Sequence, residues 1–276
     1  MTMNVESSSQ AERERDPSAD ERAPSPLAAL AQDLRGLYTL LAQTVAYCLK
    51  GKPDRRAVIA QCYAVGNGSV LFVSVTMTVV GMIAVVQSGV QTQRVLPDLS
   101  LLGANVIQIV AREFAPTVCA LMLATRVGAG IAAEIGSMVV TDQVDALRMC
   151  AADPVDYLVV PRFVACVVMT VALAFWSLFI ALVAGTLAAN MVFGLNMATF
   201  VNFSLVGIGD FVVLLLKATA YGAAIPIVSA QRGLTTFGGS EGVGWATTNA
   251  VVHSSLAIIV LDLVLSVFGY LAFPPA

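Results

Sequence analysis

Four charged residues lie inside long apolar stretches of the sequence, where an ionisable side chain requires a partner or a role. They are Arg112, Glu113, Lys217 and Asp262. A charge at the centre of a membrane-spanning helix costs about 2.5–3.5 kcal/mol on insertion scales, so each of them needs an explanation. Lys217 and Asp262 both fall near the centres of their stretches, and equal depth would let them pair across a helix bundle. Structural pairing and a polar pathway for a substrate are the two explanations, and they are not exclusive.

The neighbours Arg112 and Glu113 point about 100° apart if their stretch is helical. We therefore expect that they are not both buried against one neighbouring helix and that one of them faces a cavity. Arg126 lies near the end of the same stretch. Snorkelling of its long side chain toward the membrane interface explains a charge at that place.

A second group of charges lies in a polar segment between two apolar stretches. It begins at Glu134 and includes Asp142, Asp145, Arg148, Asp153, Asp156 and Arg162. The sequence does not indicate a conventional catalytic centre. It has one histidine, His253, and five cysteines without a Cys-x-x-Cys spacing, which argues against a metal cluster or a catalytic triad. The Gly-rich segment 238–244 lacks the Gly-Lys-Ser/Thr ending of a phosphate-binding loop, so no nucleotide site is expected in this chain.

The elements that carry these charges are predicted to be membrane-spanning helices. Of the 276 residues, 58% are hydrophobic and 12% are charged, whereas a soluble domain carries about 25% charged residues. Helices that face lipid need no polar exterior. The net charge of −3 reflects an acidic N-terminal tail, not a surface for nucleic acid. We predict an all-α integral membrane protein with five spans, at residues 69–90, 101–133, 163–190, 207–230 and 250–273.

Three further expectations concern the parts around these spans. Residues 1–26 are rich in Ser, Glu, Arg and Pro, which predicts a disordered tail. Residues 27–50 carry apolar side chains at steps of three and four, which predicts an amphipathic helix in the headgroup plane, while residues 51–276 form the transmembrane domain. Pro116 cannot donate to the carbonyl of Arg112, which predicts a kink in the second span, and a Gly-rich polar loop is expected over residues 232–248.

Basic residues gather on one side of the five spans and so predict the orientation of the chain. That side holds Lys50, Lys52, Arg55, Arg56, Arg148, Arg162 and Arg232, whereas the flanks on the other side hold Arg94 alone. Because cytoplasmic flanks carry the excess of Lys and Arg, we place the N-terminus and the segment 134–162 in the cytoplasm.

Several motifs follow one another in order from Lys50 to the C-terminus. They are Arg112-Glu113-Phe114-Ala115-Pro116, Thr125–Gly130, Ala133–Met138, Thr141–Leu147, Asp153-Pro154, Val160-Pro161-Arg162 and the stretch from Thr247 through His253 to Asp262. Together they resemble the MlaE (YrbE) permease family. The resemblance implies an ABC-type permease of a bacterial inner membrane that moves phospholipid, or a related lipid, between that membrane and the outer envelope. Relatives work as homodimers with an MCE-domain protein and a separate cytoplasmic ATPase, which binds ATP and Mg²⁺, and some also carry a STAS-domain protein.

The resemblance also implies roles for particular residues. The segment from Glu134 to Leu147 looks like the coupling helix of the family, which docks into the ATPase. The residues expected to couple are Glu134, Thr141, Asp142, Asp145 and Arg148, and those expected along the lipid pathway are Arg112, Glu113, Lys217 and Asp262. No residue is expected to be catalytic, to bind a cofactor or to hold a metal. Phe114 and Asp142 depart from the family pattern, which often has leucine and glutamate there.

Two other classes of function stay open at this point. One is an ion- or proton-coupled secondary transporter that uses Lys217 and Asp262. The other is a membrane anchor of an envelope complex, without turnover. A membrane-embedded hydrolase is disfavoured because no nucleophile, base and orienting group converge in the sequence.

Overall fold

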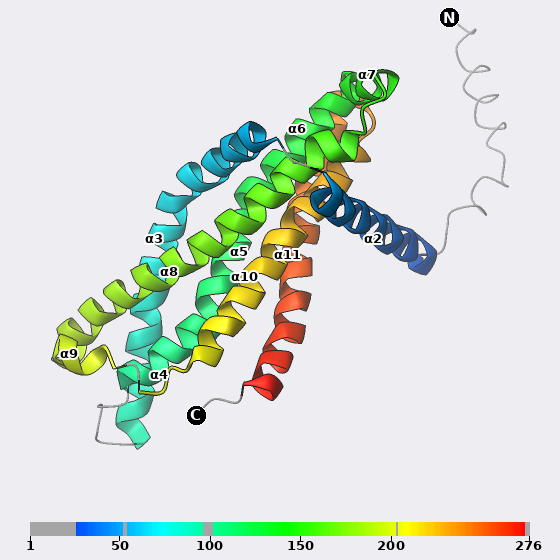
Figure 1. Cartoon of the computed structure of the whole chain (residues 1–276). Helices are drawn as coiled ribbons and strands as arrows, with labels where there is room; N and C mark the ends of the chain where they lie inside the picture. Colours follow the sequence, from blue (N-terminus) through cyan, green and yellow to red (C-terminus); the bar gives the residue numbers. More distant parts are fainter. Residues whose placement is uncertain (1–25, 52–53, 96–101, 203, 274–276) are drawn as a thin grey trace, which may run out of the picture. The chain divides into compact units, whose positions relative to one another are not determined.

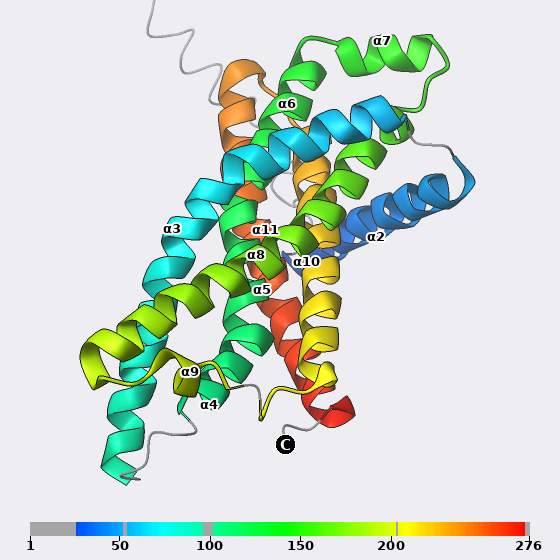
Figure 2. The same cartoon turned by 60° about the vertical axis from the view of Figure 1, so that its left-hand side comes forward.

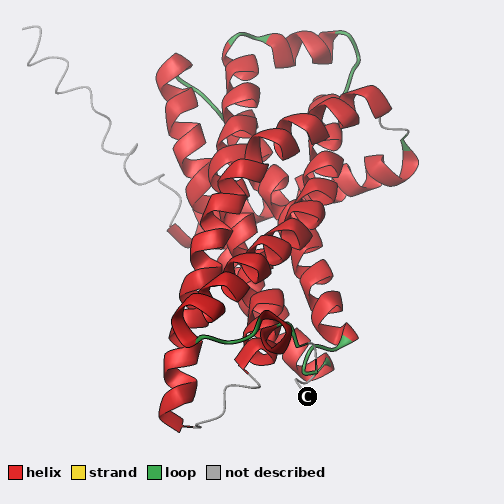
Figure 3. Cartoon of the chain, turned by 90° about the vertical axis from the view of Figure 1, so that its left-hand side faces the viewer, coloured by secondary structure: helices red, strands yellow, loops and turns green. Residues whose placement is uncertain are grey.

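The computed structural model describes residues 26–51, 54–95, 102–202 and 204–273. Every regular element among these residues is a helix (Figure 3), as predicted for an all-α membrane protein. The predicted disordered tail lies outside the described residues, apart from Pro26. The chain divides into two units, Met1–Thr39 and Leu40–Ala276, and the second unit contains all the membrane-length helices.

Five helices of the described chain are long and apolar enough to cross a membrane, and each corresponds to one predicted span (Figure 1). They are α3 (Arg55–Val95), the run from α4 (Leu102–Ile109) to α6 (Ala129–Val140), the run that ends in α8 (Val160–Phe193), α10 (Ile208–Leu234) and α11 (Gly239–Ala272). The helices extend beyond the predicted spans because hydropathy marks only the part that lipid tails would cover. The first of them, for example, begins at Arg55, well before the predicted span.

The second membrane-length helix is interrupted by two π-helical turns. After α4 come η2 (Val110–Phe114), α5 (Ala115–Leu123), η3 (Ala124–Gly128) and α6. Pro116 lies in the first turn of α5, directly after η2, and has no N–H to give to the carbonyl of Arg112. That carbonyl accepts a hydrogen bond from Lys217 Nζ at 3.0 Å instead. The irregularity expected at Pro116 is thus a π turn, and the carbonyl of Arg112 within it binds a side chain of another helix.

Close packing between the helices depends on small residues. In the larger unit α3 runs along α8, and α10 packs against α8, α6 and α11 (Figure 2). A Cβ atom at Gly81 of α3 would lie 2.6 Å from the carbonyl oxygen of Ala181 in α8. A Cβ atom at Gly222 of α10 would lie 2.9 Å from the Cα atom of Val167, also in α8. Glycine at these two crossings lets the backbones approach, as is common between membrane helices.

The loop predicted over residues 232–248 is much shorter than expected. Helix α10 continues to Leu234, and α11 already begins at Gly239. The turn is made by Gly238 and Gly239, with φ of 83° and 77°, a left-handed conformation that favours glycine. Beyond it, the hydroxyl of Thr248 donates to the carbonyl of Gly244 at 3.1 Å within the helix. The prediction was wrong because composition suggested a loop where local hydrogen bonds support a helix.

The N-terminal helix α2 (Pro26–Lys50) confirms the predicted helix, and its place in the headgroup plane stays a prediction. From Leu40 onward α2 belongs to the larger unit. There Tyr47 Oη donates to Asp153 Oδ2 at 2.6 Å, which ties the end of α2 to the segment before α8. This hydrogen bond, together with the negative charge of Asp153, raises the pKa of Tyr47 above its usual value.

Candidate functional site

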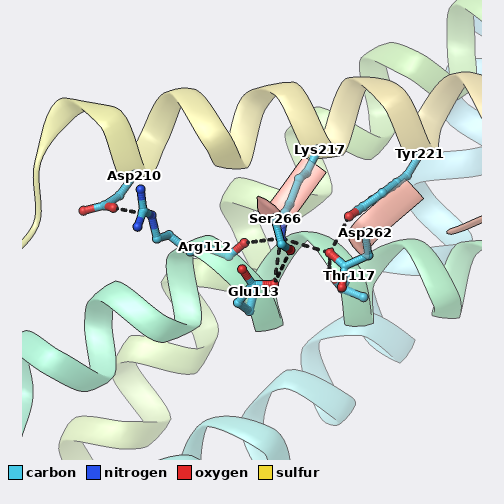
Figure 4. A network of polar contacts seen from close by, with 8 residues as sticks. All are labelled: Arg112, Glu113, Thr117, Asp210, Lys217, Tyr221, Asp262 and Ser266. Carbon is cyan, nitrogen blue, oxygen red and sulfur yellow. Dashed lines mark hydrogen bonds and ion pairs between the residues drawn. The ribbon is translucent and has the colours of Figure 1, made fainter. Parts of the chain in front are cut away.

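Lys217, near the middle of α10, is the centre of a polar network between three helices (Figure 4). Its side chain is 0% exposed. The ammonium group lies 2.7 Å from Glu113 Oε2 in η2 and 2.9 Å from Asp262 Oδ1 in α11. It also donates to Ser266 Oγ at 2.7 Å, which in turn donates to Glu113 Oε2 at 3.1 Å. The pairing of Lys217 with Asp262 predicted from their equal depth is confirmed.

Asp262 accepts two further hydrogen bonds at the same carboxylate oxygen. Tyr221 Oη, one turn after Lys217 on α10, donates to Asp262 Oδ1 at 2.6 Å. Thr117 Oγ1, just after Pro116 on α5, donates to the same oxygen at 3.0 Å. A carboxylate inside a membrane is stabilised by such charge-assisted hydrogen bonds. The network therefore joins α5, α10 and α11 through one oxygen atom.

Arg112 forms the second half of the network, toward the start of α10. Its Nε atom lies 2.7 Å from Asp210 Oδ1, and both side chains are largely buried. Asp210 Oδ2 accepts the backbone N–H of Gly207 at 2.9 Å, so the same carboxylate also caps α10. An Nη2 hydrogen bond to the carbonyl of Phe273 ties Arg112 to the end of α11.

The expectation that Arg112 and Glu113 cannot both be buried against one neighbour was wrong in part. Both residues pair with α10, Arg112 with Asp210 and Glu113 with Lys217. The partners are seven residues apart, on one face of α10, and the long arginine side chain spans the difference in direction. Glu113 nevertheless remains 43% exposed and lines a cavity of about 350 Å³ together with Arg112 and Ser266. One of the pair therefore does face a cavity, as expected.

A second, mostly apolar cavity lies against the same π turn. It has a volume of about 500 Å³ and lies between α3 and the helix run from α4 to η2. Its lining comprises Val80, Ile83, Ala84, Gln87, Ser88, Val106, Ile109, Val110 and Phe114. Phe114, the last residue of η2, follows Glu113 directly, so one turn contributes an acid to the charged cavity and an aromatic ring to the apolar one.

The second group of predicted residues lies at the other end of the bundle, around the short helix α7 (Gln143–Met149). Asp142 precedes α7 with φ of 58°, and Thr141 Oγ1 donates back to the carbonyl of Ser137. Asp145 and Arg148 form an ion pair at 2.9 Å on α7, and both side chains are mostly exposed. These four residues lie together, on or next to α7.

Glu134 does not belong to that helix, which corrects the prediction that residues 134–147 form one element. It lies in α6, and its Oε2 atom is 2.9 Å from Arg162 Nη2 in α8. The Arg162 side chain is 7% exposed and that of Glu134 is 61% exposed. Helix α6 precedes α7 in the chain, and α8 follows it. The ion pair therefore holds together the two helix ends between which α7 lies.

Sequence reasoning missed several members of these networks. Asp210, Tyr221, Thr117 and Ser266 were not singled out, and Arg162 was counted only as a flanking charge. A signal existed for Asp210 and Tyr221, because they lie seven residues before and four after Lys217, on the same helix face. Thr117 and Ser266 gave no signal, since hydroxyl residues are common in membrane helices and usually bond to their own backbone.

Comparison with known proteins shows which proteins this chain is similar to. The family profile described as Permease MlaE matches residues 58–268. A probable ABC transporter permease protein of Synechocystis sp. is 37% identical over 238 residues, which are 85% of this chain and 90% of the relative. The chloroplastic protein TRIGALACTOSYLDIACYLGLYCEROL 1 of Arabidopsis thaliana is 32% identical over 240 residues, 86% of this chain and 68% of the relative. A probable ABC transporter permease protein of Rickettsia typhi is 34% identical over 205 residues, 74% and 79% of the two chains.

Proposed function

Because the chain belongs to the MlaE permease family, we propose that it is the membrane subunit of an ABC-type lipid transporter. As a member of this family, the chain is a multi-pass permease subunit, and ABC transporter permeases work with an ATPase. In our proposal, it moves phospholipid between the bacterial inner membrane and the outer envelope. The separate ATPase supplies the ATP and Mg²⁺ chemistry, and this chain carries no cofactor of its own.

The observation that carries the proposal is the pair of cavities on either side of η2. One is lined by the polar side chains of Arg112, Glu113 and Ser266 together with mostly apolar residues of α10 and α11, and the other mainly by aliphatic side chains and Phe114. A phospholipid joins a charged headgroup to apolar chains, so two cavities at one turn, one of which has charged side chains in its lining, suit its two parts. The Arabidopsis relative is itself named after a lipid, trigalactosyldiacylglycerol, which supports a glycerolipid, although not specifically a phospholipid, as the substrate class.

The partners proposed for this chain follow the family. We propose a homodimer with an MCE-domain protein on the outer side and, in some systems, a STAS-domain protein. The apolar surface of α11 supports a second copy or lipid as its neighbour, because Leu256, Leu263 and Phe268 are all more than half exposed. If the chain were a membrane anchor without turnover, the two cavities beside η2 would have no role.

The first prediction concerns the apolar cavity. Replacing Ala84 with phenylalanine fills part of that cavity and is expected to lower ATP-driven lipid transfer about tenfold or more, since a chain that cannot enter forfeits its burial energy. The measurement is transfer of a fluorescent phospholipid from proteoliposomes that contain the chain and its ATPase. Val79→Phe is the matched control, because Val79 lies on the same helix, is 52% exposed and is not part of the cavity lining. Equal transfer by the two variants would contradict the proposal.

The second prediction concerns the contact with the ATPase. We expect Asp145→Lys on α7 to reduce lipid-stimulated ATP hydrolysis several-fold, because a charge reversal at a docking surface opposes its partner. The control is Glu241→Lys, another exposed acid-to-lysine change on the first turn of α11. If both variants hydrolyse ATP at the rate of the unaltered complex, α7 is not the coupling element.

A further inference from the structure

Arg126, in η3, differs from Arg112, Arg162 and Lys217, three other cations of the membrane-length helices. Arg112, Arg162 and Lys217 each lie within 3 Å of a carboxylate oxygen. Arg126 Nη1 instead donates to the hydroxyl of Ser69 at 2.7 Å, and within the described chain no carboxylate forms an ion pair with it. An intramembrane charge is stabilised by a counter-charge. None of the described residues supplies this counter-charge to Arg126, so a bound molecule has to supply it.

The guanidinium group of Arg126 lies against α3, although the residue as a whole is exposed. A Cβ atom at Gly68 would lie 1.7 Å from Nη2 and 2.3 Å from Cζ, so the group rests directly on the backbone of α3. Glycine inside a helix is destabilising by about 0.5–1 kcal/mol relative to alanine. At residue 68 it makes room for the arginine, and the buried hydroxyl of Ser69 fixes the orientation of the group. Simple snorkelling, the explanation suggested by the sequence, needs neither feature.

A groove opens beside this fixed guanidinium group, between α3 and the run from η3 to α6. Its volume is about 220 Å³, and it is lined by Gln61, Ala64, Val65, Arg126, Val127, Gly130, Ile131 and Glu134. No atom lies within 4 Å of the Cβ position of Gly130, so that side of the groove is empty. Glu134 is already paired with Arg162. Arg162 lies outside the groove lining, but its charge offsets that of Glu134, so Arg126 is the cation of the groove without an ion-pair partner among the described residues.

The position of the groove along α3 indicates its depth. Ser69 is the first residue of the predicted charge-free span, and the same helix begins with Arg55 and Arg56 on the basic, cytoplasmic side. Arg126 thus lies at the level where the headgroups of the cytoplasmic leaflet meet the acyl chains. Phosphate groups are the anions present at that level, and the planar guanidinium fork binds phosphate oxygens in pairs.

We propose that this groove binds the phosphate of a glycerophospholipid of the cytoplasmic leaflet, with Arg126 as the phosphate-binding residue. Gly68 and Ser69 position the guanidinium group, and the small and aliphatic residues of the groove contact the first carbons of the acyl chains. The site is separate from the network around Lys217. It deepens the proposed lipid transport, on which the choice of lipid class rests, by giving the chain a point of phospholipid capture on the cytoplasmic side.

The test is a native mass spectrometry titration of the purified, delipidated full chain with palmitoyl-oleoyl phosphatidylglycerol. Arg126→Gln removes the charge at nearly constant size and is expected to weaken lipid binding about tenfold, the scale of a charge-assisted hydrogen bond. Gly130→Leu fills the groove without a change of charge and is expected to weaken binding similarly. Gly244→Leu on α11 is the matched control, because the Cβ position there also has no neighbour within 4 Å and lies outside the groove.

Two competitors identify the chemistry of the ligand. Palmitoyl-oleoyl glycerol, which has the same chains and no phosphate, is expected to compete at least tenfold less well than phosphatidylglycerol. Millimolar inorganic phosphate is expected not to displace the lipid. Displacement by free phosphate, equal binding of the two lipids, or full binding by both Arg126→Gln and Gly130→Leu would each overturn the proposal.

This readout is independent of transport. Ala84→Phe is expected to lose lipid transfer yet retain groove binding, so failure of the transport proposal leaves the titration interpretable. If Arg126→Gln loses lipid binding but retains lipid transfer, the groove binds lipid outside the transport path. Size-exclusion profiles and thermal unfolding midpoints that match those of the unaltered chain verify that each variant is folded.

Discussion

Replacing Lys217 with methionine is expected to lower the free energy of unfolding by about 3–5 kcal/mol, the cost of removing one partner of a buried ion pair. The side chain is 0% exposed, and its ammonium group contacts Glu113, Asp262 and Ser266. Without it, two carboxylates within one membrane network lose their shared counter-charge, and the carbonyl of Arg112 loses its donor. Thermal unfolding of the detergent-solubilised chain and the yield of monodisperse protein measure this loss.

A second variant separates the structural role of this pair from a role in transport. Lys217→Met combined with Asp262→Asn leaves Glu113 as the remaining carboxylate, and Glu113 is 43% exposed. We expect the double variant to recover much of the lost stability, because a buried pair replaced as a unit leaves less uncompensated charge. Lipid transfer is expected to stay at least tenfold below normal if the charges contact the lipid. Recovery of both stability and transfer would show that the pair is only structural.

The helical, membrane-spanning character of the chain could be predicted from the sequence because it follows from composition and periodicity alone. Five charge-poor stretches long enough to cross a bilayer predict five membrane-spanning helices. The described residues contain five helices of membrane length. The pairing of Lys217 with Asp262 could also be predicted, because depth in a membrane is a single coordinate that the sequence position approximates. The ends of the helices could not, since polar residues such as Arg55 continue a helix beyond the apolar stretch.

The rest of the site could not be predicted, for two physical reasons. Which helix faces which is decided by close packing at residues such as Gly81 and Gly222, and one sequence does not reveal their partners. The π turns also shift the direction of every side chain that follows them. Arg112 and Glu113, which lie within the first π turn, both reach α10, which regular helical geometry did not suggest. Recognition of the motifs supplied the roles of these residues, and only the structure supplied their partners.

The two π turns of the second membrane-length helix place its charges at opposite ends of the bundle. η2 carries Arg112 and Glu113 into the network with α10 and α11, and η3 carries Arg126 to the groove beside α3. The same helix continues through α6 to Glu134 and then to α7. One continuous helix thus joins the charged cavity, the groove and the segment proposed to contact the ATPase. A displacement of this helix would move the charged cavity, the groove and the α7 segment together. The contact that attaches the helix to α8 is therefore important.

That attachment is the ion pair of Glu134 with Arg162, and its two halves are expected to respond differently to substitution. Glu134→Gln leaves the arginine, 7% exposed, without its carboxylate and is expected to lower the free energy of unfolding by about 3 kcal/mol. Arg162→Met leaves a carboxylate that is 61% exposed to solvent, and an apolar side chain of similar length takes the buried place, so a change below about 1 kcal/mol is expected. Thermal unfolding of the two variants measures the difference.

Coupling to ATP hydrolysis is expected to follow a different pattern from stability. If the ion pair holds α6 and α8 at the spacing that presents α7, both variants lose lipid-stimulated hydrolysis to a similar extent, although only Glu134→Gln unfolds more readily. Arg148→Met is the matched control for stability alone, because it removes an exposed arginine from an ion pair and is expected to change stability by less than about 0.5 kcal/mol, whereas its hydrolysis is not compared because Arg148 is itself expected to contact the ATPase. Normal coupling in Arg162→Met would contradict a positioning role, because that variant lacks the ion pair while keeping the fold.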